Sequence, residues 1–225
     1  VATVPANRGE TPSTTEGTAP PPAPASAADE VGPGIWPFTT GAEADASDES
    51  AYTDPVETAR RFLTEYVGFT RLTMGEFAQG DSRSGEVTAT SRTDGPVTTV
   101  LVRLLGSSDR WTVIGAVTPN IVLGVPGALE EVGSPVRIEG RSTAFEGNVV
   151  VEVRQDGGPR TTLGLEPLTG GSMGELGPLV GNVPIRTPTE RGGAVLATTD
   201  SAMDGAVEEA TVVRVRFAGP EDPGG

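Results

Sequence analysis

The stretch SPVRIEGRSTAFEGNVVVEVR, residues 134–154, decides the fold of the C-terminal half of this chain. Its first and last parts alternate apolar with polar or charged residues, which is the period of a strand with one buried face. Between them lies Glu146-Gly147-Asn148, whose glycine and asparagine tolerate the positive φ of a tight reversal. The stretch therefore predicts a β-hairpin. Its inward-facing positions are Val136, Ile138, Val149, Val151 and Val153.

The composition agrees with a β protein and argues against an enzyme. Glycine and proline contribute 31 and 20 of the 225 residues, and aromatic residues only 4%, which favours turn-rich β structure. The chain has no histidine, no cysteine and, because every basic residue is arginine, no lysine. Ser-His-Asp and Cys-His nucleophiles, His/Cys zinc sites and Schiff-base chemistry are therefore excluded. The sequence predicts a protein without catalytic residues, cofactor or metal, and an enzyme that works through carboxylates is the least favoured alternative.

The charge and hydropathy patterns limit the partners. A net charge of −15 argues against nucleic acid, which needs a basic face. No apolar run reaches the eighteen residues or so of a membrane span. The abundance of arginine without lysine is typical of a GC-rich coding bias.

The first fifty residues have the composition of a linker. Residues 1–50 are rich in Pro, Ala, Ser, Thr and acids, with little to bury, so we predict a disordered acidic tether. Such a leader is typical of an exported protein, and we expect that a signal peptide, ending in a lipidated cysteine, was removed upstream of Val1. Within the tether, Gly34-Ile35-Trp36-Pro37-Phe38 is an apolar island. We expect it to dock onto the folded body as an edge segment, with a recognition motif as the alternative.

Residues 51–119 predict a small α+β domain. Asp54 as N-cap, Pro55 at N1 and Glu57 at N3 begin a helix that runs to Val67 and ends at Gly68. Three strands follow, with a short additional strand at 76–79, so the helix should cover an antiparallel meander. The three strands are expected at 85–92, 97–104 and 111–117.

Residues 120–219 predict an immunoglobulin-like β-sandwich, followed by a frayed tail at 220–225. The basis is the number of short alternating strands with turn signals between them. The Gly-rich segment 166–181 is expected to be a mobile loop. The seven strands are expected at 121–125, 134–141, 149–154, 161–165, 182–186, 194–199 and 211–217.

Three motifs of this half resemble a known family. They are Val122-x-x-Val125-Pro126, then Gly133-Ser134-Pro135-Val136-x-Ile138-x-Gly140, then Ala144-Phe145-Glu146-Gly147-x-Val149. Together with the closing strand they resemble the immunoglobulin-like domain of bacterial spore-germination proteins, which is associated with the GerM domain, over residues 121–218. The resemblance implies an exported, non-catalytic β-sandwich of the bacterial envelope. No GerM-like pattern is found in residues 50–120, which puts a sporulation or germination role in doubt.

The candidate binding residues are four arginines on two strands. Arg137 and Arg141 share one strand, and Arg214 and Arg216 share another. If the fold brings them together, they form a basic patch for an anionic wall polymer. The alternative is cross-strand ion pairing with Glu152 and its neighbours, which contributes little energy.

Other acidic and glycine-rich motifs favour a structural role over a ligand-binding or catalytic one. Asp200–Gly205 lacks the full ligand set of a calcium loop, so a polar turn is expected. The pairs Glu130-Glu131 and Glu208-Glu209 do not suggest a catalytic carboxylate pair, because neighbours in a strand point in opposite directions. They are expected to be solvated. The stretch Gly171–Gly177 lacks the lysine of a phosphate loop.

These observations lead to one functional prediction and one alternative. We predict a non-catalytic, exported binding or scaffolding module of the cell envelope, extracellular or anchored to the surface as a lipoprotein, with an envelope protein or wall polymer as partner. The contact surface would be the groove between the two domains or a sheet face. The alternative is a small-molecule or glycan sensor that uses a pocket between the domains. The sequence sets no oligomeric state.

Overall fold

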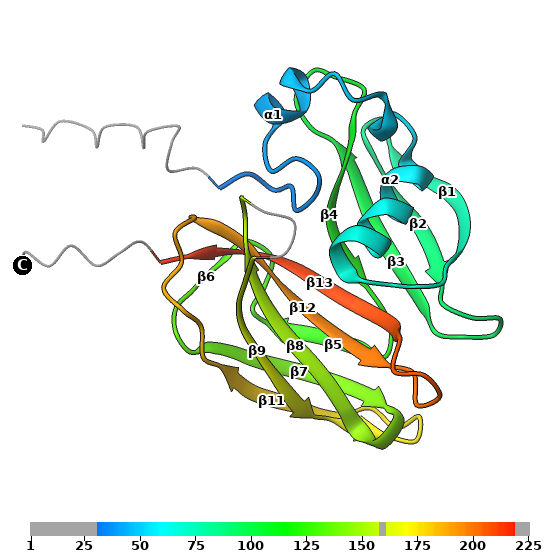
Figure 1. Ribbon diagram of the computed structural model, residues 1–225, viewed down its shortest axis with the longest axis vertical. Coiled ribbons are helices and arrows are strands. Elements are labelled where there is room, and N and C mark those ends of the chain that lie inside the picture. The colour runs from blue at the N-terminus through cyan, green and yellow to red at the C-terminus, as the bar shows by residue number, and fades with distance from the viewer. Residues whose placement is uncertain (1–30, 158–160, 219–225) are drawn as a thin grey trace, which may run out of the picture. The chain divides into compact units, whose positions relative to one another are not determined.

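The computed structural model describes residues 31–157 and 161–218 of the chain. Within these residues the strands form a nine-stranded and a four-stranded sheet, both largely antiparallel (Figure 1). The predicted mainly-β class with an immunoglobulin-like sandwich is confirmed. In spatial order, the nine-stranded sheet contains β1 (Thr73–Asp81), β2 (Ser84–Thr90), β3 (Val97–Leu104), β4 (Trp111–Val117), β13 (Val207–Phe217), β12 (Gly192–Asp200), β8 (Asn148–Gln155) and β9 (Thr161–Thr169), with β6 (Glu130–Val132) beside β13. The four-stranded sheet contains β5 (Ile121–Val125), β7 (Val136–Ala144), β10 (Gly171–Ser172) and β11 (Gly177–Val183).

The predicted helix is present, with an altered second half. The Asp54 carboxylate accepts hydrogen bonds from the amides of Val56 and Glu57 at 2.8 and 2.9 Å, which begins α2 (Pro55–Arg61). The chain continues without a break into a π-helical segment, η2 (Phe62–Val67). Gly68 then ends the helix with φ of 108°, a conformation that glycine adopts without steric cost.

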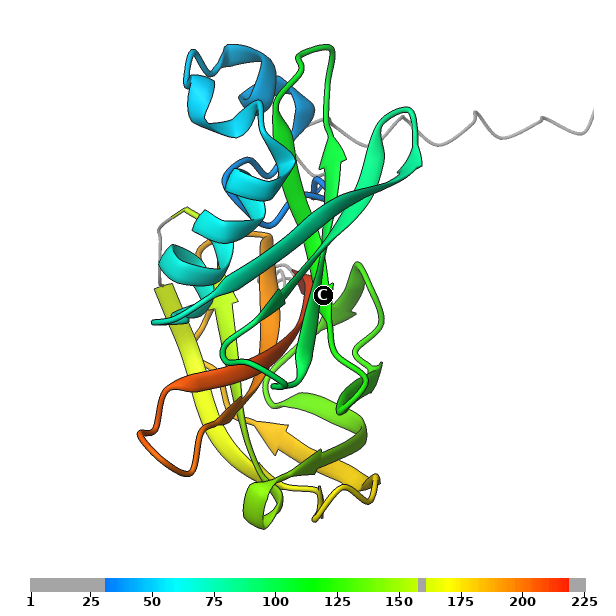
Figure 2. The ribbon, with the colours of Figure 1, turned by 90° about the vertical axis from the view of Figure 1, so that its right-hand side faces the viewer.

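The helix covers the meander as predicted. α2 contacts each of β1 to β4, and Figure 2 shows it lying against one face of these strands. Its apolar side packs in a cluster with buried residues of the strands. A short helix cannot persist alone in water, so this burial is what stabilises it. The cluster includes Phe62, Leu63, Tyr66, Val87, Val100, Val102 and Val113.

The tether prediction is wrong for residues 31–50. This part of the chain contains α1 (Gly41–Ala46) and leads into η1 (Ser50–Tyr52), and its apolar side chains pack with Leu105. The island docks as predicted: the amide of Ile35 donates to the carbonyl of Val113 and the amide of Val113 donates to the carbonyl of Trp36, both at 2.8 Å. These few apolar residues bury enough surface to order a segment whose average composition is that of a linker. Residues 1–30 of the predicted tether and the predicted tail at 220–225 lie outside the described residues.

The hairpin predicted for residues 134–154 is wrong, although its turn is right. β7 pairs with β5, β10 and β11, whereas β8 pairs with β9 and β12, so the two strands belong to different sheets. At the turn η3 (Phe145–Gly147), Gly147 has φ of 72°, as its type predicts. Asn148 is extended with φ of −85°, and Glu146 has φ of 57°, which its type does not predict. The turn therefore carries the chain from one sheet to the other. The alternating residues of both strands do meet, across the core between the sheets.

A second correction concerns the predicted loop 166–181. The structure places the end of β9, all of β10 and the first half of β11 there, and β11 begins at Gly177 rather than at residue 182. Glycines were the reason for predicting a loop, yet several of them allow close strand approach. A Cβ at Gly181 would overlap the side chain of Leu168, and one at Gly170 would overlap Ser142.

The nine-stranded sheet joins the two halves of the described chain. β13 pairs with β12 on one side and, through Val212 and Ala116, with β4 on the other. One face of β13, β12 and β8 packs on the four-stranded sheet, and the opposite face packs against the helix cluster. β12 is consequently buried on both faces along most of its length. The division of the chain into domains near residue 119 stays a prediction beside this shared sheet.

Candidate functional site

Two buried arginines lie on the helix-covered face of the nine-stranded sheet. Arg214 on β13 is 2% exposed, and Arg154 on β8 is also buried. A buried guanidinium is tolerated only when its donors are satisfied and its charge is balanced. These two side chains therefore show where the polar interactions of this face are concentrated.

Arg214 is held by a two-point ion pair. Its Nη1 and Nη2 atoms donate to the two carboxylate oxygens of Asp156 at 2.5 and 2.7 Å. Its Nε donates to the carbonyl of Gly32 at 3.0 Å, and Nη1 also reaches the carbonyl of Gly193 at 3.2 Å. This geometry matches the planar fork of arginine to a carboxylate. Arg214 thereby ties residue 32, at the start of the described chain, to the end of β8.

Arg154 holds Tyr66 in place. Its Nη1 donates to the backbone carbonyl of Tyr66, its Nη2 donates to Glu152 at 2.5 Å, and its guanidinium lies 5.1 Å from the centre of the Tyr66 ring. The same ring stacks on Phe62 at a centroid distance of 5.3 Å. The ring of Tyr66 is thus fixed by a cation–π contact and an aromatic contact.

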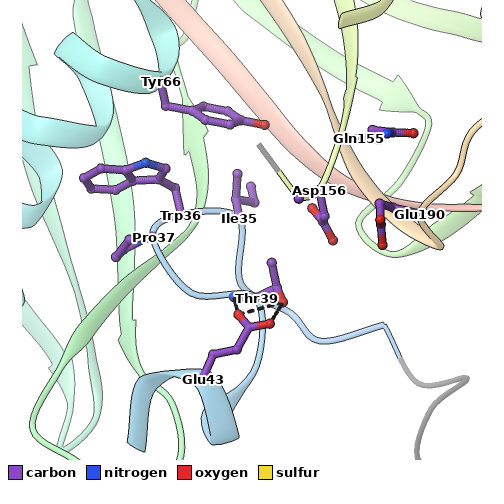
Figure 3. Close-up of a pocket in the computed structure, with 10 residues that line it drawn as sticks. Ile35, Trp36, Pro37, Thr39, Glu43, Tyr66, Gln155, Asp156 and Glu190 are labelled. Carbon is purple, nitrogen blue, oxygen red and sulfur yellow. Dashed lines mark hydrogen bonds between the residues drawn. The ribbon is translucent and has the colours of Figure 1, made fainter. Parts of the chain in front are cut away.

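Tyr66 opens onto a cavity of about 500 Å³. One wall comes from the docked N-terminal segment and the other from the end of β8 and the loop before β12, as Figure 3 shows. The Tyr66 hydroxyl points into this space toward the wall that carries Asp156. We call it the Tyr66 cavity. It is lined by Ile35, Trp36, Pro37, Thr39, Glu43, Tyr66, Gln155, Asp156, Gly157 and Glu190.

The polar groups of the Tyr66 cavity differ in how far they are engaged. Gln155 exchanges two hydrogen bonds with Thr189, and Glu43 accepts from the amide and hydroxyl of Thr39. Among the described residues, the Tyr66 hydroxyl and the Glu190 carboxylate make no hydrogen bond. Burial raises the pKa of Tyr66, so its hydroxyl stays protonated and can donate at neutral pH.

A second recess lies where the β2–β3 turn approaches the sandwich. It has a volume of about 440 Å³ and is rimmed by two large apolar side chains, Phe145, 62% exposed, and Met173, 83% exposed. We call it the Phe145 groove. Apolar side chains this exposed at neighbouring loop tips are typical of a contact surface. Its lining also includes Arg92, Asp94, Pro96, Asn120, Glu208 and Glu209.

The four arginines selected from the sequence do not form one patch. Arg137 and Arg141 lie on β7 in the four-stranded sheet, whereas Arg214 and Arg216 lie on β13 in the nine-stranded sheet. Arg137 is exposed and pairs with Glu139. Arg141 donates to the carbonyl of Leu176 at 2.7 Å, and Arg216 donates to the carbonyl of Leu129 at 2.8 Å. A binding role for these residues stays a prediction, and Arg214 would have to leave its buried pair to fulfil it.

Glu209 is buried, so the expectation that both members of the pair Glu208-Glu209 are solvated is wrong. Its carboxylate is buried and accepts from the hydroxyl of Thr118 at 2.6 Å, the amide of Asn120 at 3.1 Å and the hydroxyl of Thr199 at 3.1 Å. Burial raises the pKa of Glu209, and these hydrogen bonds oppose the rise. Glu208, pointing the other way, pairs with Arg92. Glu209 therefore fastens the segment that joins the two halves to strands β12 and β13.

The segment Asp200–Gly205 is a turn between β12 and β13, as expected. Asp204 pairs there with Arg71. In the part of the chain that the structure describes, no three acidic, histidine or cysteine side chains converge on a possible metal position. Over the same residues, no helix has the length and hydropathy needed to span a bilayer.

Sequence reasoning missed the residues of both recesses. Tyr66 fits the apolar face of the predicted helix, and Asp156 and Glu190 were not selected as candidates. One signal was present: Arg154 and Arg214 each stand beside valine in a strand, and such charges become buried when a second layer covers their face. Only the fold shows that η2 is that layer.

The comparison with known families concerns the sandwich. The family model for the immunoglobulin-like domain of bacterial spore germination matches residues 120–206. This match confirms the resemblance found in the sequence, from β5 to the turn that precedes β13. No curated protein and no solved structure matches the chain.

Proposed function

We propose that this protein is a non-catalytic binding or scaffolding module of the bacterial cell envelope, extracellular or anchored to the surface through a lipidated N-terminus. The family match supports the module's immunoglobulin-like character. The location and the anchor rest on the composition of the first thirty residues and on what the resemblance implies. The proposal takes no germination role from the family, because the match covers residues 120–206 only.

The observation that carries the proposal is the Phe145 groove. Phe145 lies on the turn between β7 and β8, and Met173 on the turn between β10 and β11, so two separate loops place apolar side chains at one recess. Each side chain costs free energy when it is exposed, at about 25 cal/mol per Å² of apolar surface. A partner that covers both would recover that energy.

The charges of the groove favour an envelope protein over an anionic wall polymer. The acidic residues Asp94 and Glu208 are among its lining residues, and Arg92 is already paired with Glu208. A polyanion would meet an acidic rim on a protein of net charge −15. A protein surface with an apolar centre and basic rim fits the same groove.

The test is co-sedimentation of the full chain with separated envelope fractions. The purified chain is mixed with cell-wall polymer, with membrane protein fractions and with protease-treated membranes of a bacterium that carries the gene. We expect binding to the protein-containing fraction, lost after protease treatment. The double variant Phe145→Ser with Met173→Asn should weaken it at least tenfold. Asparagine suits residue 173, where φ is 56°.

The matched control is Met203→Asn. Met203 is 93% exposed on a different turn, between β12 and β13, so its replacement should leave binding unchanged. Equal binding by the double variant would refute the groove as the contact surface. Binding to purified wall polymer instead would replace the protein partner with a polysaccharide. For the location, the full-length gene product should appear in the surface fraction, and recovery in the cytoplasm would refute the exported role.

A second candidate function is a small-molecule or glycan sensor, and the Tyr66 cavity favours it. Its volume of about 500 Å³ lies within the range of small-ligand sites. Its polar groups include a buried, fixed tyrosine hydroxyl without a partner among the described residues. Ligand-induced stabilisation of the folded chain against heat tests this function, because any ligand that binds only the folded state raises Tm.

A further inference from the structure

The described charged residues that line the Tyr66 cavity are acidic, which disfavours an anionic ligand and favours a small organic cation. We propose that it binds a primary ammonium carried on a hydroxylated body of monosaccharide size. This inference rests on the second proposed function, the sensor, and adds the chemical class of its ligand. The envelope-binding function of the Phe145 groove does not depend on it.

Among the described residues, the charged side chains that line the cavity are all carboxylates. They are Glu43, Asp156 and Glu190. Asp156 is neutralised by its two-point pair with Arg214, and Glu43 is held by Thr39. Glu190 lies on the loop before β12 and makes no ion pair among the described residues. An ammonium in the cavity would therefore find Glu190 as its counter-charge.

The two nearby arginines, Arg154 and Arg214, have no accessible donors with which to bind an anion. The Nε, Nη1 and Nη2 atoms of Arg214 all donate to protein oxygens. Arg154 uses Nη1 on the carbonyl of Tyr66 and Nη2 on Glu152, and its remaining Nε is buried. An incoming phosphate or carboxylate would therefore gain no free guanidinium from Arg154 or Arg214, and it would face Glu190.

A separate observation, independent of the carboxylates, points to a ligand. The Tyr66 side chain is 6% exposed, and its hydroxyl is directed into the cavity with no hydrogen-bond partner among the described residues. A tyrosine hydroxyl can both donate and accept a hydrogen bond, and a fixed one that faces a cavity is free to bond a molecule bound there. A hydroxyl group of the ligand, opposite the ammonium, would supply that partner.

The shape of the cavity sets the size of the body that carries these groups. Ile35, Trp36 and Pro37 form an apolar side, and Asp156 and Glu190 face it from the end of β8 and the loop before β12. Trp36 is fixed by an edge contact to Tyr52 at 5.4 Å and by the strand-like bonds to Val113. A flat side of one sugar ring can rest on this wall while its polar groups turn toward Tyr66 and Glu190.

The test compares three sugars that differ in charge. Dissociation constants are measured for glucosamine, glucose and glucose 6-phosphate on the full chain by titration calorimetry or by NMR shifts. We expect glucosamine to bind at least fivefold more tightly than glucose, and glucose 6-phosphate more weakly than either. The preference for glucosamine should shrink as sodium chloride rises from about 50 to about 300 mM, because salt screens a partly exposed pair.

Three variants assign the contributions. Glu190→Gln should reduce the preference for glucosamine over glucose to below twofold and leave glucose binding unchanged. Tyr66→Phe, which keeps the ring and its packing, should weaken both sugars by about threefold to tenfold through one lost hydrogen bond. Glu175→Gln, an exposed carboxylate on the β10–β11 turn, is the matched control and should change neither. A thermal melt of each variant confirms that it is folded.

The outcomes separate the inference from the function beneath it. Equal affinity for glucosamine and glucose, with Glu190→Gln inert, would overturn the cationic ligand and leave a sensor of neutral sugars. Tightest binding of glucose 6-phosphate would overturn it as well. No binding of any of the three sugars would overturn the sensor function together with the inference.

Discussion

Arg137 on β7 and Arg214 on β13 occupy equivalent positions in the sequence and opposite environments in the fold. Each stands between two β-branched residues in an alternating strand. Arg137 lies on the open face of the four-stranded sheet and pairs with Glu139 on its own strand. Arg214 lies on the covered face of the nine-stranded sheet and pairs with Asp156 across it. The same pattern thus produces a surface ion pair in one sheet and a buried one in the other.

The difference comes from what covers each face. An isolated sandwich would expose the outer face of both sheets. Here η2 and the N-terminal segment from residue 32 onward cover the outer face of β13, β12 and β8. Strand alternation reports which side chains share a face, and it carries no information about whether another layer covers that face. The comparison also explains why the covered face, and not the open one, contains the Tyr66 cavity.

The largest expected effect is from Arg214→Ala. The variant removes a buried charge and leaves Asp156 without its partner, so the free energy of unfolding should fall by about 3–5 kcal/mol. Equilibrium denaturation in urea measures it. Arg216→Ala, two residues along the same strand and exposed, is the control and should cost less than about 0.5 kcal/mol. Similar losses from both variants would contradict the distinction between the covered and the open end of this face.

The next effect compares one substitution on the covered and the open sheet. Val212→Ala removes two methyl groups from the helix cluster, where Val212 is buried, and should destabilise the protein by about 2 kcal/mol. Val180→Ala makes the same change on β11, where the side chain is largely exposed, and should be nearly neutral. Denaturation midpoints at constant m-value measure both. A cost at Val180 as large as at Val212 would mean that the four-stranded sheet is also covered.

Local sequence signals predicted much of the fold, and distant contacts decided the rest. Asp54, Pro55 and Gly68 set the limits of the helix through local capping chemistry, so their prediction needed no tertiary information. Gly147 likewise predicted its own positive φ, whereas the positive φ of Glu146 was not predicted by its type. Whether β7 pairs with β8 is settled by β11 and β12, which compete for the same edges and come 20 or more residues later.

The candidate sites were less predictable for the same reason. The Tyr66 cavity combines Trp36, Tyr66, Asp156 and Glu190, which are scattered over most of the chain. Each has an ordinary local role, in a docked segment, a helix face or a loop. Tyr66 in particular satisfies the helical pattern of its segment. Only the fold shows that its ring contacts Phe62 and Arg154 while its hydroxyl faces the cavity.

A smaller effect, specific to pH, is expected at Glu209. Burial raises its folded-state pKa above the ordinary value of 4.5, so the folded state binds this proton more tightly than the unfolded state does. The contribution of Glu209 to stability is therefore full below about pH 4.5 and decreases as pH rises through the folded-state pKa. As pH rises over that interval, wild type should therefore lose unfolding free energy relative to Glu209→Gln. Urea denaturation at a series of pH values measures it.

The neighbouring glutamate provides the control for that pH trend. Glu208→Gln removes a carboxylate that pairs with Arg92 outside the core, so the wild-type trend should persist in this variant. A trend unchanged in Glu209→Gln would show that another carboxyl group causes it. The comparison tests whether burial, and not acidity in general, controls the response at the junction of the two halves.

The smallest effect is expected from Arg137→Ala, at the open end of the comparison. Its partner Glu139 lies two residues away on the same exposed face, where solvent and salt screen the pair. The loss should be below about 0.5 kcal/mol at low salt and should vanish at about 0.5 M sodium chloride, as urea denaturation would show. Because the loss of Arg137 should not disturb the fold, its proposed contact with a polyanion can be tested directly by substitution. Reduced binding to wall polymer by a fully stable Arg137→Ala would show that the open face has a binding role, whereas the same loss in Arg214→Ala could arise from unfolding alone.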